Sequence, residues 1–178
     1  MKILRSLLNP KNRLDMVAGI CDGVLTALTL VAGKLLGPEA GVTASLALRV
    51  AVAAAISGAF IFFVAHYSVL RAELVEAERQ LNLTESGRMA TTHLGRAILT
   101  EAVCQALVTS LCSFAGALLP LLVGVLMPML TIIVALVALG MLGAFLGHTV
   151  HGRPLFWAVG LFVGGIALTG VGFYLRIV

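Results

Sequence analysis

The sequence of 178 residues contains little charge: 11% of its residues are Asp, Glu, Lys or Arg, whereas 60% are hydrophobic. This balance excludes a soluble globular domain. The sequence has no phosphate-binding loop, no nucleophile triad and no zinc signature, so we do not expect an enzyme. Its three cysteines are an odd number without the spacing of a disulfide framework, and we interpret them as small apolar residues.

Long hydrophobic runs fill the sequence instead. The hydrocarbon core of a bilayer is about 30 Å thick and is crossed by a helix of about 20 apolar residues. A chain of 178 residues with one hydrophilic interruption has room for five such helices. We therefore predict a single all-α integral membrane domain over residues 1–178, with spans near residues 15–36, 43–66, 97–123, 127–147 and 155–176.

Lysine and arginine predict the orientation of these spans. If the N-terminus is cytoplasmic, nine of the twelve Lys and Arg residues lie on the cytoplasmic side and three on the other. The positive-inside rule then places the C-terminus across the membrane from the N-terminus. The net charge of +4 lies in short loops without a recognition motif, so we expect membrane lipid, and no nucleic acid, as a partner.

No cleavable signal is recognised near the N-terminus, because its short apolar stretch is broken within a few residues. We therefore expect a multi-pass protein of the cell membrane if the source is a prokaryote. In a eukaryote we expect a vacuolar or other organelle membrane.

The hydrophilic interruption, residues 67–96, has a helical pattern. Apolar residues recur at helical spacing from Leu70 to Leu81, so we predict that the second helix extends into the cytoplasm as an amphipathic segment. Its acids alternate with arginines, and we interpret them as a solvated face rather than a metal site. His66 and Tyr67, at the exit of the second span, are interpreted as anchors in the headgroup region.

Polar and small residues of the first span fall on one helix face, which is formed by Asp15, Gly19, Asp22, Thr26, Thr29 and Gly33. Such a face either packs against another helix or lines a watered path. An intramembrane carboxylate costs about 3 kcal/mol on insertion scales, so Asp22 favours a function. We predict that Asp22 is a metal ligand in a transport path, that Thr26 adds a hydroxyl, and that Gly19 lines the path.

A second polar stripe follows the third span: Glu101, Gln105, Thr109, Cys112 and Gly116. Glu101 lies about one turn inside the predicted cytoplasmic end, so it is either an interfacial carboxylate or part of an entrance to the path. The continuation through Gln105 and Thr109 favours an entrance. We therefore predict Glu101 as a further metal ligand and Gln105 and Thr109 as lining residues.

Two other patterns are assigned to structure rather than to function. Pairs of glycines four residues apart in the fourth and fifth spans are typical of helix packing. Two histidines at the end of the fourth span have a spacing that suits a metal, but they are flanked by glycine and are interpreted as interfacial residues. These residues are Gly143 with Gly147, Gly160 with Gly164, and His148 with His151.

The first-span pattern Gly19-x-x-Asp22-Gly23-x-x-Thr26, which runs on to Ala32-Gly33, resembles the first span of the vacuolar iron transporter family, which includes nodulin-like relatives. Five spans, a cytoplasmic N-terminus and a hydrophilic loop after the second span agree with that family. Further matches are Ser57, the run Gly116-Ala117-Leu118-Leu119-Pro120, and Gly170-x-x-x-Tyr174.

The resemblance implies a homodimer that moves Fe²⁺, and often Mn²⁺, out of the cytoplasm in exchange for protons, with no permanently bound cofactor. Asp22 matches the aspartate of the family's transport path. Iron-transporting members have methionine where Gly58 stands and a Gly-Glu-Tyr run where this chain has Ile61-Phe62-Phe63. The chain is also a short form without the long glutamate-rich helical insert.

Two classes of function remain open. In the first, the chain is a metal transporter: burial favours a protonated carboxyl group and a bound cation favours the carboxylate, so metal entry expels a proton. In an implied dimer, Gly19 and Gly33 allow the first span to approach its symmetry mate, which brings two copies of Asp22 together. In the second class, the chain is a non-transporting scaffold of the same fold, and transport of another solute is a third possibility.

Overall fold

The computed structural model describes residues 10–34, 43–80 and 93–175. These residues form five α-helices, all of them long and apolar enough to cross a membrane. A proline begins three of the five helices, as its fixed φ and missing N–H favour. The helices are α2 (Pro10–Lys34), α3 (Ala44–Gln80), α4 (His93–Leu126), α5 (Pro128–Thr149) and α6 (Pro154–Leu175).

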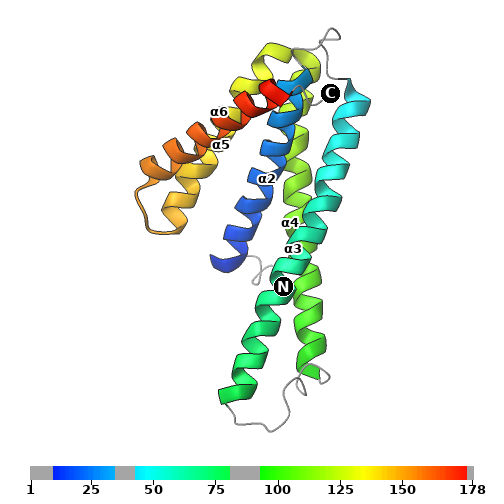
Figure 1. The fold of residues 1–178 in the computed structure, drawn as a ribbon, viewed down its shortest axis with the longest axis vertical. Helices are drawn as coiled ribbons and strands as arrows, with labels where there is room; N and C mark the ends of the chain where they lie inside the picture. The colour runs from blue at the N-terminus through cyan, green and yellow to red at the C-terminus, as the bar shows by residue number, and fades with distance from the viewer. Residues whose placement is uncertain (1–9, 35–42, 81–92, 176–178) are drawn as a thin grey trace, which may run out of the picture.

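The five predicted spans are confirmed as helices, and so is the extension of the second one. The helix α3 has 37 residues. At 1.5 Å per residue it is about 55 Å long, well beyond the hydrocarbon core of about 30 Å. The helices α3 and α4 run side by side and extend past α2 at one end (Figure 1). The rest of the predicted amphipathic segment, residues 81–92, lies outside the described residues.

The helix α2 is the centre of the bundle. It contacts all four other described helices and lies between the α3–α4 pair and the α5–α6 hairpin (Figure 1). By contrast, α3 contacts α2 and α4 but neither α5 nor α6. The largest buried side chains include Leu28 and Val31 of α2, Leu121 of α4 and Leu139 of α5.

Glycines allow the backbones of α2 and α4 to meet. A Cβ atom added at Gly19 would overlap the backbone oxygen of Thr109, and one added at Gly23 would overlap that of Ser113. From the other side, a Cβ atom at Gly116 would overlap the backbone oxygen of Ile20. Gly19 therefore packs against α4 of its own chain. The expected approach of Gly19 to a symmetry mate is not the contact that the structure makes with it.

The hairpin of α5 and α6 uses one of the two predicted glycine pairs. Gly143 and Gly147 lie against the backbone of α6 at Trp157 and Pro154, so their role in helix packing is confirmed. Nothing in the described structure lies within 4 Å of a Cβ atom added at Gly160 or Gly164. That pair therefore makes no close packing contact with the described part of the chain.

The turn between α5 and α6 places both of its histidines at the surface. His151 has a φ of 55°, the left-handed conformation that ends many helices. The N–H of Gly152 donates to the carbonyl of Gly147 at 2.9 Å, which closes the turn. His148 and His151 are both exposed. His148 lies in the last turn of α5, and His151 lies beyond the end of that helix.

Replacing Gly23 by Ala should lower the melting temperature of the purified protein, because the added methyl group would overlap the backbone of α4. Overpacking of this kind typically costs about 1–3 kcal/mol. Gly164→Ala is the matched control, since its added carbon meets open space. The melting temperature of each variant is measured in detergent by heating samples and recording the folded protein that remains by size-exclusion chromatography. Equal melting temperatures for the two would contradict the close packing of α2 on α4.

Candidate functional site

The two polar stripes predicted on separate spans face each other. Gly19 of α2 lies against the side chains of Thr109 and Cys112 of α4, so two of the predicted path-lining residues are in contact. The helix α3 closes the third side of this contact. We refer to the polar residues between these three helices as the polar seam, which consists of Asp15, Asp22, His66, Gln105, Thr109 and Ser113.

Asp22 lies at the point where α2, α3 and α4 meet. The hydroxyl of Ser113, which is completely buried, donates to Oδ2 of Asp22 at 3.0 Å. A hydrogen bond to a carboxylate is about twice as strong as one between neutral groups. From α3, Gly58 faces the same carboxylate: a Cβ atom at Gly58 would lie 3.6 Å from Oδ2 of Asp22 and 3.5 Å from Oγ of Ser113. Asp22 is therefore partly buried in the seam, with one hydroxyl donor.

The other two predicted metal ligands are placed differently. The hydroxyl of Thr26 donates to the backbone carbonyl of Asp22 at 2.9 Å, so its hydrogen is used within α2. Glu101 is exposed and precedes Ser113 by twelve residues, which is about 18 Å along α4. Within one chain, the structure thus keeps Thr26 near Asp22 but does not bring Glu101 to them. Among the described residues, no three His, Cys, Asp or Glu side chains form a group that suits a metal ion.

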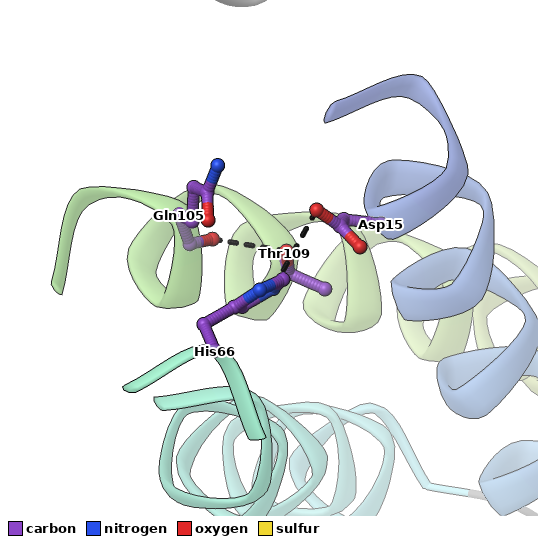
Figure 2. Close-up of polar contacts among 4 residues, drawn as sticks. All are labelled: Asp15, His66, Gln105 and Thr109. Atoms are coloured by element: carbon purple, nitrogen blue, oxygen red, sulfur yellow. Dashed lines mark hydrogen bonds and ion pairs between the residues drawn. The ribbon is translucent and has the colours of Figure 1, made fainter. Parts of the chain in front are cut away.

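The second carboxylate of the seam, Asp15, lies opposite a histidine of α3 (Figure 2). Nε2 of His66 is 3.5 Å from Oδ2 of Asp15, and the two side chains are only 19% and 28% exposed. Beside them, the hydroxyl of Thr109 donates to the backbone carbonyl of Gln105 at 2.9 Å. His66 therefore belongs to the seam, and its interpretation as a headgroup anchor is wrong because its ring turns inward to Asp15.

Two residues of the seam, His66 and Ser113, were not predicted from the sequence, although each lies at helical spacing from other residues of its face. The buried small residues of α3, Ala47, Ala51, Ala54 and Gly58, recur at helical spacing, and two further steps of four reach His66. On α4, the step from Thr109 leads to Ser113 by four residues rather than to Cys112 by three. Steps of three and four both stay near one face, so spacing alone did not decide between them.

The seam holds two carboxylates on one face of α2, seven residues and about 10.5 Å apart along the helix axis. One is paired with a hydroxyl and the other with an imidazole, and carboxylate, hydroxyl and imidazole are the groups with which proteins hold cations and protons. Comparison of the chain with protein-family models, with curated proteins and with solved structures gave no match. The role of the seam is therefore inferred from its own residues.

Replacing Ser113 by Ala should destabilise the protein, because the Asp22 carboxylate would lose its buried hydroxyl donor. A hydrogen bond to a charged group contributes about 1.5–3 kcal/mol. Ser68→Ala is the matched control, since the exposed Ser68 hydroxyl bonds the carbonyl of Ala65 in its own helix. Thermal unfolding in detergent measures the loss, and the same change in an Asp22→Asn background should cost less. If Ser113→Ala is as mild as the control, the bond between Ser113 and Asp22 does not form.

Proposed function

We propose that the chain is a transporter of divalent metal cations, Fe²⁺ or Mn²⁺, which leave the cytoplasm in exchange for protons along the polar seam. The observation that carries the proposal is the pair of carboxylates on one face of a helix long and apolar enough to span a membrane. Intramembrane carboxylates are costly, and they commonly mark ion paths and proton relays. The resemblance of the first span to the vacuolar iron transporter family supports the same function.

In this proposal Asp22 is the central ligand of the cation. Hard and borderline divalent cations bind oxygen, and the hydroxyl oxygens of Ser113 and Thr26 lie in the same neighbourhood. One carboxylate and two hydroxyls leave coordination positions open. Water or the second copy of a homodimer fills them, and Glu101 collects cations at the exposed end of α4.

The alternative function is a non-transporting membrane scaffold. One observation favours it: the Asp22 carboxylate already accepts a hydrogen bond from Ser113, at a place where glycines allow the backbones of α2 and α4 to touch. Under this alternative, Asp22 holds α2 and α4 together, and its loss weakens the fold rather than a transport rate.

Asp22→Asn separates the two functions, because asparagine keeps the size and hydrogen bonding of aspartate but removes its charge. In proteoliposomes loaded with a pH-sensitive dye, we expect metal uptake and metal-dependent proton movement to fall to background. The protein should still fold, with a loss of melting temperature no larger than that of Ser113→Ala. Glu76→Gln, a neutralisation on the exposed part of α3, is the control and should transport normally.

Two results of this experiment would go against the transporter. Normal metal uptake by the Asp22→Asn variant would exclude Asp22 from the path. Loss of the folded protein, with Glu76→Gln unaffected, would favour the scaffold.

Gly58→Met tests the metal chemistry in the opposite direction, by adding a ligand. Gly58 faces the Asp22 carboxylate across a gap that accepts a Cβ atom at ordinary contact distance. A thioether there offers a soft ligand that suits Fe²⁺ better than a hydrocarbon does. We expect tenfold tighter Fe²⁺ binding, or about 1.4 kcal/mol. Gly58→Leu, similar in volume but without sulfur, should bring no such gain, and equal binding by both variants would place the cation elsewhere.

A further inference from the structure

His66 and Asp15 form a half-buried pair whose charge depends on the imidazole. Nε2 of His66 is buried and makes no hydrogen bond to the described residues, while Oδ2 of Asp15 lies 3.5 Å away, at ion-pair distance (Figure 2). A carboxylate and a bare imidazole nitrogen are both acceptors and repel each other, so a hydrogen on Nε2 favours the pair. With this one hydrogen the imidazole is neutral, and with a second hydrogen on Nδ1 it is an imidazolium ion.

Asp15 is the charged group that decides between these two states. Among the described residues, Gln105 and Thr109 of α4 lie beside the pair, and both are uncharged (Figure 2). Arg13 on α2 and Glu101 on α4 have exposed side chains. On α3 itself, the neighbouring Tyr67 accepts a hydrogen bond from Arg71 at 3.3 Å.

Asp15, the α2 member of the pair, lies on the same face of α2 as Asp22, two turns away. Between Asp15 and Asp22, Gly19 packs directly on Thr109, so the backbones of α2 and α4 are in contact there. In this protein interior, the charge of a divalent cation at Asp22 acts on the imidazolium with little screening by solvent. A cation at Asp22 therefore disfavours the second hydrogen of His66.

We propose that the Asp15–His66 pair is the proton-binding site of the exchange, which holds one proton when Asp22 is empty and releases it when a divalent cation binds at Asp22. The inference rests on the proposed function, from which it takes the cation. In the release step the Nδ1–H bond breaks and its proton passes to water. The hydrogen on Nε2 of His66 remains in place, next to the Asp15 carboxylate. The charge of the pair then changes from 0 to −1 as the cation arrives.

The first test compares His66→Gln with His148→Gln in proteoliposomes that take up Mn²⁺, with metal and internal pH recorded together. Glutamine keeps an N–H donor for Asp15 but binds no proton in this range. We expect His66→Gln to move one proton fewer per metal ion that is taken up, and to lose the part of the pH dependence of the rate that comes from an imidazole. His148 is exposed at the end of α5, and His148→Gln should behave like the unchanged protein. An unchanged ratio of protons to metal in His66→Gln would overturn the proposal.

The second test observes the proton directly and does not depend on transport. Nuclear magnetic resonance of histidine labelled with ¹⁵N in the full chain follows the titration of each imidazole, and His66→Gln assigns the signal. We expect Cd²⁺, a diamagnetic divalent cation, to move the midpoint of His66 to lower pH in the unchanged protein but not in Asp22→Asn. The proposal would be overturned if Cd²⁺ does not shift the midpoint of the His66 titration, or if the shift persists in Asp22→Asn. It would also be overturned if His66 does not titrate between about pH 5 and 9.

The two proposals fail in different ways. Normal metal uptake by Asp22→Asn overturns the proposed function. Uptake that depends on Asp22, together with a His66 titration that ignores the cation, overturns only the role of the Asp15–His66 pair.

Discussion

The backbone contact between α2 and α4 is the interaction on which the rest of the structure depends. Helices in a bilayer gain no hydrophobic free energy by associating, so close van der Waals contact and interhelical hydrogen bonds must hold them. Gly19, Gly23 and Gly116 allow that contact. It sets the polar stripe of α2 onto that of α4 and places Ser113 within hydrogen-bond distance of Asp22. Because α2 also contacts α3, α5 and α6, its position fixes the arrangement of the bundle.

The seam treats its two carboxylates differently, and this difference is the chemical basis of the proposed exchange. Asp22 has a neutral hydroxyl partner, which brings no positive charge of its own. Asp15 has an imidazole partner that is able to supply a positive charge itself. Asp15 and Asp22 lie about 10.5 Å apart along the axis of α2. A divalent cation at Asp22 and an imidazolium at His66 therefore repel each other, which couples the occupancy of the two positions.

The sequence predicted the five helices, the extension of α3 and both polar stripes, because hydropathy and helical spacing depend on local residues alone. It did not predict the partner of each stripe. Spacing defines a face but not what covers that face, so Gly19 was assigned to a symmetry mate although it packs on Thr109. His66 and Ser113 were missed for the same reason. Their side chains contact Asp15 and Asp22, and these residues are distant in the chain.

The limited contacts of α3 make the two sides of the seam unequal. The helix α3 packs extensively on α4 but only slightly on α2, and it contacts neither α5 nor α6. The described bundle is therefore a pair and a hairpin that share α2 (Figure 1). Because glycines hold α2 against the backbone of α4, the boundary between α2 and α3 is the side on which Asp22 is least enclosed by tightly packed backbone.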